Sequence, residues 1–454
     1  MKKSTLALAV AVGVLAQQAY AETQAEAKGF IEGATSTLGL RNFYINNDNR
    51  SGKPAQSLSS EWGQGFDLRF NSGYTQGTVG FGLDVIALEG IRLDTGGGSN
   101  GATKTNYSST VFPSEATGGK NAKSVNDFGS LGLTGKVRVS QTELKIGTLL
   151  PNNPVIKAND GRLLPQTFTG GQVTSNEIKD LTLTLGQIEK AKGRNSSNDE
   201  DLSIAGANSS SDFTKGKFSN KFLYAGADYK ITKDLVASYY YGELKDFYSQ
   251  NFLGLVHNWA IGPGVLKSDL RYYRSRDNGA NGNTSGYFTS GYYTDAAKPV
   301  TAGKVDNDLY SYLALYSVAG HTFGGGYQYT KGESDFPWLN QGDGSSNSTI
   351  TDMQIQKFAR AGEKTWQARY AYDFAKVGVP GLTAGVIYLH GEDIKTTTGD
   401  KSEWERDISL AYVIPEGTFK NLGFAWKNAM WRTNVATSNQ DENRLIVSYS
   451  IPLL

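Results

Sequence analysis

Hydrophobic and polar residues alternate along many short segments of this chain, and the last eleven residues show this most clearly. One face of this segment carries Leu445, Val447, Tyr449, Ile451 and Leu453, whereas the other carries Arg444, Ser448 and Ser450. Successive side chains of a strand project to opposite faces, and a strand that crosses a bilayer needs about nine to eleven residues. The segment therefore predicts a membrane-barrel strand whose polar face carries an arginine.

Other segments repeat this alternation and predict further strands. Residues 365–374 place tryptophan and tyrosine on one face and Arg369 on the other. Residues 62–70 and 79–85 alternate on either side of an Asn-Ser-Gly turn. This second pattern predicts a hairpin with one wet face.

Two more alternating segments place basic side chains on the polar face. Residues 131–146 alternate around a tight turn and put three basic side chains on one wall, and residues 35–44 put Arg41 on the polar face. The first and last strands of a closed barrel must pair. We therefore expect Arg41 to lie near Arg444.

The connections between these segments differ in length, as expected for a barrel with short turns at one end and long loops at the other. Gly, Ser, Asn and Asp are abundant in four predicted extracellular loops, which are Thr95 to Asp127, Lys192 to Thr214, Asp277 to Asp308 and Asp335 to Gly362. Disordered linkers between soluble domains are the alternative. Alternating segments flank each loop, which favours the barrel.

The segment from Leu149 to Gly171 differs from the other connections because it is apolar and contains Pro151, Pro154 and Pro165. Proline supplies no N–H to a strand ladder, so this segment is not predicted to be a strand. Such an apolar loop is poorly suited to bulk water. We expect residues 149–171 to fold into the lumen as a constriction, with an ordinary outward loop as the alternative.

The first 21 residues have the features of a secretory signal peptide. Lys2 and Lys3 precede an apolar run, which ends at the small-residue site Ala19-Tyr20-Ala21. A membrane-anchor helix is the alternative, but the run is shorter than the roughly 18 apolar residues that such a helix needs. We therefore predict a signal peptide at residues 1–21 and a barrel domain at residues 22–454.

Composition is compatible with a soluble secreted protein and with an outer-membrane barrel. The chain has no cysteine, its mean hydropathy is below zero and its formal net charge is +1. Lipid-facing and lumen-facing residues cancel in such averages. The 54 glycines, 25 tyrosines and 7 tryptophans favour many short strands with aromatic girdles. The near-zero charge gives no reason to expect nucleic acid as a partner.

Candidate catalytic chemistry is sparse. Three histidines and no cysteine leave little material for Cys/His catalysis or a zinc site. No Gly-x-Ser-x-Gly elbow is present, and the glycine runs at 96–98 and 324–326 are not followed by the Lys-Ser or Lys-Thr pair of a phosphate loop. We expect no enzymatic activity, no catalytic residue, no metal and no cofactor.

The most informative set of residues is basic and lies at lumen-facing positions. Its members are Arg41, Lys136, Arg138, Lys145, Lys267, Arg271, Arg369, Lys427 and Arg444, with Arg162 in the candidate constriction loop. A positive track in a narrow pore attracts anions, and arginine grips a carboxylate through two donors. The alternative is that these cations merely pair with acids on the same face, such as Asp67, Asp84, Glu143, Asp269 and Asp373.

Motifs along the whole mature chain resemble those of the OprD family of substrate-specific outer-membrane channels from pseudomonads. The motifs are Ala27 to Glu32, Leu40 to Tyr44, Thr75 to Gly82, Lys136 to Arg138, Arg162 to Thr167, Gly362 to Tyr370, Gly378 to Thr383 and Arg444 to Val447. The resemblance implies an 18-stranded barrel, an inward-folded third loop and a ladder of arginines and lysines that guides carboxylate-bearing nutrients. Periodicity alone does not count the strands.

Departures from the family pattern bear on the substrate. Ile387, Ala411 and Ala425 stand where the basic-amino-acid channels of the family are expected to carry further ladder residues. The family resemblance also implies an acidic residue near the constriction that receives the cationic end of a substrate, and Glu333 matches this position. The chain looks closer to the OprE-like members, in the subfamily that favours small or cyclic carboxylates.

These observations predict a passive channel in the outer membrane of a Gram-negative bacterium, for small carboxylate solutes. One alternative is a general diffusion porin, in which the charges only tune ion selectivity. Another is a surface adhesin or receptor that binds through the long loops. Outer-membrane lipid and lipopolysaccharide are expected around the barrel, and the sequence is compatible with a monomer or a homotrimer.

Overall fold

The structure is a computed structural model. It describes residues 23–51, 57–94, 98–100, 103–106, 110–113, 124–204, 218–284, 304–340, 348–396, 398–436 and 438–454. The predicted signal peptide at residues 1–21 lies outside these residues, as do parts of all four predicted extracellular loops.

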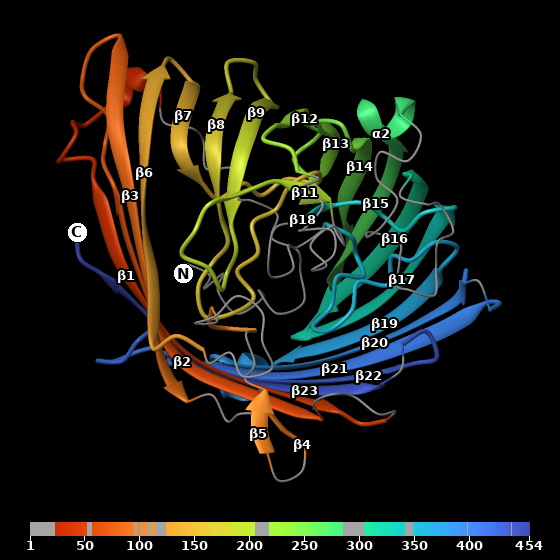
Figure 1. Ribbon diagram of the computed structural model, residues 1–454. Coiled ribbons are helices and arrows are strands. Elements are labelled where there is room, and N and C mark those ends of the chain that lie inside the picture. The colour runs from red at the N-terminus through yellow and green to blue at the C-terminus, as the bar shows by residue number, and fades with distance from the viewer. Residues whose placement is uncertain are drawn as a thin grey trace.

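Eighteen long strands form the wall of a closed barrel (Figure 1). They are β1 (Thr35–Asn49), β2 (Leu58–Asn71), β3 (Val79–Asp94), β6 (Asp127–Val139), β7 (Thr142–Leu149), β8 (Thr167–Ser175), β9 (Leu181–Lys192), β12 (Phe222–Lys230), β13 (Leu235–Leu244), β14 (Tyr248–Ile261), β15 (Gly264–Asp277), β16 (Asp306–Val318), β17 (His321–Gly332), β19 (Lys364–Asp373), β20 (Leu382–Ile394), β21 (Lys401–Val413), β22 (Gly423–Thr433) and β23 (Gln440–Pro452). The predicted all-β barrel of about 18 strands is confirmed.

Each wall strand is antiparallel to its neighbours, and β1 closes the barrel by pairing with both β2 and β23. In the closing pair, Arg41 lies opposite Ser448 and Ile45 lies opposite Arg444. Closure satisfies the backbone N–H and C=O groups that an open sheet edge would expose to lipid.

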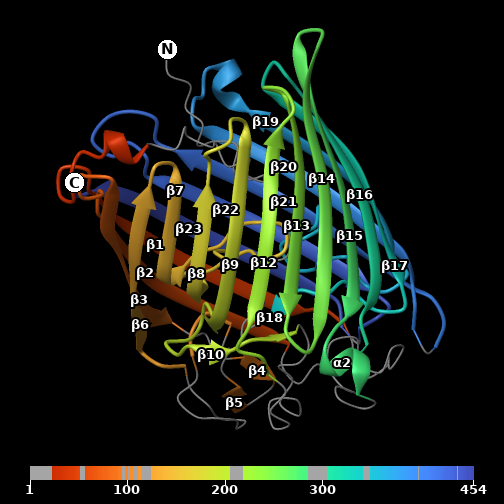
Figure 2. The ribbon, with the colours of Figure 1, turned by 90° about the horizontal axis from the view of Figure 1, so that it is seen from above.

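The two ends of the barrel differ in the length of their connections. Tight turns join strands at one end, such as the turn between β6 and β7 that the sequence predicts, where Ser140 has a φ of 52°. The other end carries the long connections (Figure 2). Its small elements are β4 (Gly98–Asn100), β5 (Thr103–Asn106), β10 (Glu200–Asp201), β11 (Ser203–Ile204), α2 (Ala280–Asn283) and β18 (Leu339–Asn340).

Helical structure is minor. The 3-10 helix η1 (Gln24–Glu26) precedes β1, and η2 (Phe374–Val377) follows β19. Across the described residues, no helix has both the length and the apolar character needed to cross a membrane.

Alternation along each strand separates a lipid-type outer surface from a polar interior. On β23, Leu445 is 51 % exposed on the outside, whereas Glu442 is 5 % exposed on the inside. On β6, Leu131 faces outward and is 69 % exposed, whereas Lys136 faces inward and is buried. The alternation of apolar and polar residues in the sequence therefore arises because successive side chains of a strand face outward and inward in turn.

Two larger apolar clusters, and a small one of Leu313, Leu315 and Ile350, pack the barrel interior, which is not an open tube. One cluster joins β8, β9 and β12 to β16 with Val155 and Phe336. The other joins Phe43, Leu88 and Phe112 with Leu163 and Leu164. Both clusters therefore include residues 150–166, which connect β7 to β8.

A carboxylate outside the strands joins two of the tight turns. Glu177 accepts hydrogen bonds from the Gln141 backbone N–H at 2.8 Å and from the Ser140 and Thr142 hydroxyls at 2.9 and 3.0 Å. The bond from the Gln141 amide is the main cause of a lowered Glu177 pKa, below the usual 4.5.

Glu177→Gln is expected to lower the apparent unfolding temperature by roughly 1 to 2 °C at pH 7. A lowered pKa stabilises the folded state above the ordinary pKa, and this contribution is lost as the pH falls through the folded-state pKa. Heat-dependent gel mobility at pH 7 and pH 3 measures the effect. The variant should differ from the wild type only at pH 7, and an equal difference at both values would contradict the assignment.

Candidate pore constriction

The loop at residues 150–166 lies against the inner wall of the barrel. Leu163 fits against two glycines of β2, and a Cβ at Gly65 would lie 2.9 Å from the Leu163 carbonyl oxygen. Only glycine leaves room for this approach, because any side chain would displace the loop backbone. The loop is shorter than the predicted segment 149–171, because Leu149 ends β7 and residues 167–171 belong to β8.

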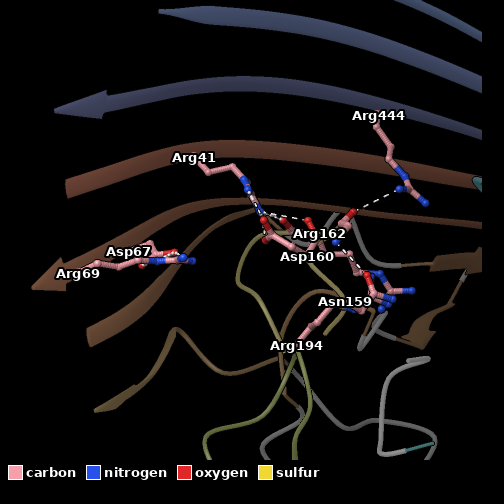
Figure 3. A network of polar contacts seen from close by, with 9 residues as sticks. Arg41, Asp67, Arg69, Asn159, Asp160, Arg162, Arg194 and Arg444 are labelled. Atoms are coloured by element: carbon pink, nitrogen blue, oxygen red, sulfur yellow. Dashed lines mark hydrogen bonds and ion pairs between the residues drawn. The ribbon is translucent and has the colours of Figure 1, made fainter. Parts of the chain in front are cut away.

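Arg41 on β1 holds the tip of this loop (Figure 3). Its guanidinium pairs with the Asp160 carboxylate, with an Nη1 to Oδ1 distance of 2.7 Å and an Nη2 to Oδ2 distance of 3.1 Å. Nη1 also donates to the Arg162 carbonyl oxygen at 2.6 Å. This two-pronged contact fixes the loop next to a wall arginine.

Arg444 on β23 contacts two segments that are far apart in the sequence. It donates to the carbonyl oxygens of Gly161 at 3.2 Å and Gln354 at 2.9 Å, and it pairs with Glu442 at 2.6 Å. The prediction that Arg41 and Arg444 lie near each other is supported, because both contact residues 160–162. Through Gln354, Arg444 also contacts a second segment that folds inward.

This second inward segment comprises residues 348–356. Its carbonyl oxygens accept hydrogen bonds from wall arginines, since Arg271 donates to Ser348 and Arg369 donates to Ile350 at 2.6 Å. The prediction of an extracellular loop from Asp335 to Gly362 is therefore wrong for this part. Backbone groups make these contacts, so no side-chain pattern indicates them.

The amides of the same segment face carboxylates on β21. Glu405 accepts hydrogen bonds from the N–H groups of Ile355 and Gln356, both at 2.9 Å, and Asp407 accepts one from Gln354 at 3.3 Å. The segment is thus held by acids at its N–H groups and by arginines at its carbonyl groups. Several backbone groups of the segment therefore have a side-chain partner on the barrel wall.

The connection from the inward segment to β19 is anchored by a buried ion pair. Arg360 Nε lies 3.3 Å from Glu403 Oε1, and the Trp431 indole donates to Glu403 at 2.9 Å. Burial, reinforced by the Glu403 charge, raises the pKa of nearby Glu363 well above its ordinary value. The anchor therefore combines one arginine with several carboxyl groups in a dry environment.

Half of the predicted basic residues are paired with acids. The pairs are Arg41 with Asp160, Lys136 with Asp84, Lys145 with Glu143, Arg271 with Asp269, and Arg444 with Glu442. Three of the acids stand two residues before their cation on the same strand face. The alternative in which lumen cations balance lumen acids therefore holds for these five.

Two predicted residues, Lys267 and Lys427, have no hydrogen bond or ion pair among the described residues. Lys267 shares one row of the sheet with Arg369, because β15, β16, β17 and β19 pair in register along Lys267, Leu315, Gly324 and Arg369. Three strand spacings separate the two backbones by roughly 15 Å. Gly324 has no side chain, which leaves Arg369 room to lie over it.

Lys136 and Arg138 form a separate group near the turn end of the barrel. Both lie over the Tyr74 ring, at 4.9 and 4.1 Å from its centroid. Lys136 donates to the Ser72 carbonyl oxygen at 2.8 Å, and Arg138 donates to Gln24 of η1 at 3.1 Å. Arg138 thereby holds the N-terminal segment, whereas Lys136 holds the connection after β2. Among the described residues, neither makes a hydrogen bond or an ion pair with residues 150–166.

The structure places Glu333 away from the constriction. Its carboxylate pairs with Lys395 at 2.8 Å, and its side chain is 57 % exposed. The Glu333 amide donates to the carbonyl oxygen of Asp306, the first residue of β16. Glu333 therefore lies at the loop-side rim, because β17 ends one residue before it. Asp160 is the acid at the tip of the inward loop.

Several residues of the site were absent from the predicted set. Arg69 pairs with Asp67 at 2.7 Å, and Arg194 donates to Asn159 at 3.0 Å (Figure 3). The alternation along β2 in the sequence already places Arg69 on the lumen side. Arg194 follows β9 in a loop, where parity carries no information.

Two cavities flank the inward loop. One of 480 Å³ is lined by Arg41, Asp67, Leu163 and Pro165, and another of 310 Å³ is lined by Arg69 and Lys145. Each combines a cation with an acid or an apolar loop surface. The larger one could take a small anion with an apolar body.

Lys427→Gln is expected to weaken block of the channel by a small carboxylate about threefold to tenfold. Lys427 faces the lumen directly opposite Arg444 in the β22 and β23 pair, and within the described part of the chain it makes no ion pair. Block is measured as the benzoate concentration that halves the single-channel current. Lys331→Gln removes an outward, exposed lysine as the control, and equal shifts in both variants would contradict the assignment.

Comparison with known proteins gives a consistent result. Residues 28–453 match the family model described as outer membrane porin, OprD family. The porin-like protein GalP of Pseudomonas putida is 36 % identical over 434 residues, 95 % of each chain. Porin D of Pseudomonas aeruginosa is 33 % identical over 480 residues, covering 100 % of this chain and 99 % of its own.

Solved structures agree with this match. The crystal structure of Pseudomonas aeruginosa OccK8 (OprE) has 57 % sequence identity and a TM-score of 0.84, covering 94 % of this chain and all of that one. Pseudomonas aeruginosa OpdK, solved with vanillate, has 35 % identity and a TM-score of 0.80, covering 93 % of this chain and 100 % of that one.

Proposed function

Because the chain belongs to the OprD family of outer-membrane porins, we propose that it is a passive channel for small carboxylate-bearing solutes, guided by lumen arginines and lysines. It is a substrate-specific channel of the Gram-negative outer membrane and not an enzyme. The carboxylate preference and the roles of single residues are the proposal. We also expect outer-membrane lipid and lipopolysaccharide around the apolar outer wall.

The observation that carries the proposal is the set of lumen cations without an acidic partner. Among the residues that the structure describes, Lys267 and Lys427 make no ion pair, and the hydrogen bonds of Arg369 go to the neutral groups of Gln367 and Ile350. Their charge is therefore available to a passing anion. In a partly dry pore such charges attract anions from a longer distance than in bulk water.

Passage requires contacts that are strong enough for entry and weak enough for exit. Arg369 and Arg444 already donate to loop carbonyl oxygens, so a substrate carboxylate would exchange for these acceptors rather than fill an empty site. An exchange of hydrogen-bond partners leaves only a small net free-energy change. This lets a solute move between neighbouring cations without being trapped.

The cavity beside Arg41 supports a substrate with an apolar body. Leu163, Leu164 and Pro165 line this cavity together with the guanidinium. Vanillate, which was present in the OpdK structure, is an aromatic carboxylate. A small or cyclic carboxylate would place its charge at Arg41 and its ring against the loop.

Uptake into liposomes tests the proposal directly. Benzoate, succinate and glutamate are compared with a neutral sugar of similar size, for the wild type, Arg369→Ala and Arg162→Ala. We expect the carboxylates to enter faster than the sugar, and Arg369→Ala to lose most of this preference. Equal rates for all solutes in every variant would instead identify a general diffusion porin, the alternative favoured by the five lumen ion pairs.

A further inference from the structure

One arginine of β21 faces outward, on the lipid side of the barrel wall. Its neighbours in the strand, Glu405 and Asp407, hold the inward segment from the lumen side, so the alternation places Arg406 on the outside. Arg406 lies two residues from Trp404 toward the turn end of β21, and the Trp404 ring stacks on Tyr388 of β20. Such rings mark the level of the membrane interface. Arg406 therefore lies where lipid headgroups of the loop-side leaflet meet their acyl chains.

The charge of Arg406 is not balanced by the part of the chain that the structure describes. Within that part, Arg406 makes no ion pair, and its Nη2 donates to the neutral amide oxygen of Asn428 at 2.7 Å. Its Nε is buried and has no hydrogen-bond partner among the described residues. A charged side chain on the lipid face is destabilising below the interface. The guanidinium therefore has both an unbalanced charge and donors to offer to an anion from the membrane.

Arg406 begins a row of polar side chains on the outer wall. Asn428 on β22 donates to the Asn443 side chain on β23 at 3.0 Å, and Asn443 pairs in register with Asn46 on β1. We call Arg406, Asn428, Asn443 and Asn46 the arginine–amide row. One register position nearer the turn end, the same outer face is apolar or aromatic, at Trp426, Leu445 and Tyr44.

The charges on the loop side of this row are already paired. Arg432 pairs with Asp441 at 2.6 Å, and Arg50 Nε lies 3.2 Å from the same carboxylate. Arg50 also pairs with Asp48 at 2.7 Å. Two arginines and two aspartates balance each other here, so the surplus positive charge of this part of the wall belongs to Arg406.

We propose that the arginine–amide row binds the headgroup of one lipopolysaccharide molecule, with a phosphate of its lipid A on Arg406. The long connections lie on the same side as this row, and the lipid leaflet on that side of a Gram-negative outer membrane is built from lipopolysaccharide. A guanidinium matches the geometry of a phosphate through two parallel donors. The charge of the phosphate thus complements the charge that the described wall leaves unbalanced.

The rest of the row fits the part of lipid A that lies below its phosphates. The acyl chains of lipid A are joined to its sugars by amide and ester groups, which carry carbonyl oxygens. Amide side chains at Asn428, Asn443 and Asn46 can donate to such oxygens. The acyl chains would then lie against Trp426 and Leu445, one register position lower. The proposal names one site within the lipid around the wall, and it rests on the outer-membrane location rather than on the solute that the channel admits.

Native mass spectrometry of the purified full barrel in detergent tests this site. The probes are lipid A with two phosphates and phosphatidylethanolamine, whose amine compensates its phosphate. The variants are Arg406→Gln, Arg406→Lys and Asn428→Leu, and Lys331→Gln removes an outward, exposed lysine of β17 as the control. Heat-dependent gel mobility confirms that each variant is folded.

We expect one lipid A to stay bound to each wild-type chain, and Arg406→Gln to lower the bound fraction at least fivefold. Arg406→Lys keeps the charge but loses the second donor, so it should bind an intermediate fraction. Asn428→Leu should bind at least twofold less lipid A although its charge is unchanged, because it loses the amide that orients the guanidinium. Lys331→Gln should bind like the wild type.

Equal binding of lipid A to the wild type and to Arg406→Gln would overturn the proposal. Equal retention of phosphatidylethanolamine and lipid A by the wild type would also overturn it, since the row would then be a general lipid surface. Benzoate uptake into phospholipid liposomes without lipid A should be unchanged in Arg406→Gln. Failure of the lipid A site therefore leaves the proposed solute untouched, and failure of the proposed solute leaves the lipid A site untouched.

Discussion

Replacing Arg444 with alanine is expected to reduce carboxylate uptake about tenfold and to shift ion selectivity from anions toward cations. Arg444 is a charged wall side chain that donates to both inward segments, through the carbonyl oxygens of Gly161 and Gln354. Its loss also leaves Glu442 buried without its cation. Removing one partner of a buried ion pair costs roughly 3 to 5 kcal/mol, and the remaining carboxylate repels anions.

Reversal potentials in a salt gradient and benzoate uptake into liposomes measure the two effects. Arg432→Ala is the matched control, since Arg432 pairs with Asp441 and lies beside the outward Trp404 ring. Arg444→Lys keeps the charge but has fewer donors, so it should retain selectivity while its current becomes noisier. Unchanged uptake and selectivity in Arg444→Ala would remove this residue from the permeation path.

Replacing Glu405 with glutamine is expected to raise the single-channel conductance and the open-channel noise. The Glu405 carboxylate accepts two backbone N–H groups of the inward segment, both at 2.9 Å. A glutamine side chain has the same size, but it offers one acceptor oxygen and turns a donor toward the second N–H. A buried donor left unsatisfied costs about 1 to 3 kcal/mol, enough to free the segment in a substantial fraction of channels.

Single-channel recording in planar bilayers detects this change. Glu392→Gln removes an exposed, outward carboxylate from the neighbouring strand and should leave the current unchanged. Asp407→Asn should have a smaller effect than Glu405→Gln, because Asp407 accepts one longer bond, 3.3 Å from the Gln354 nitrogen. A quiet channel of ordinary conductance in Glu405→Gln would show that other contacts hold the segment.

The sequence predicted the barrel because strand alternation is a local property. Each outward leucine and each inward arginine on β23 follows from a period of two, whatever the rest of the chain does. The same parity placed Arg41, Arg369 and Arg444 on the inner wall. Closure between the first and last strands followed from the need to satisfy backbone groups in lipid.

The detailed site could not be predicted to the same extent. The inward segment at residues 348–356 is held mainly through its own N–H and C=O groups, which every residue possesses. Glu333 was matched to the family pattern across a loop of uncertain register, and the structure places it at the rim. A lumen cation can also be neutralised from a neighbouring strand, as the pair between Lys136 on β6 and Asp84 on β3 illustrates.

The contact between Arg444 and Gly161 joins residues 283 positions apart in the sequence. Contacts between distant parts of a chain form late in folding, because the ends of a long loop must first be brought together. Because Arg444 lies on β23, this contact requires β23 to be in place beside β1. The constriction is therefore complete only in the closed barrel. A folding intermediate without the paired β23 would lack the contact between Arg444 and Gly161 and would discriminate poorly among solutes.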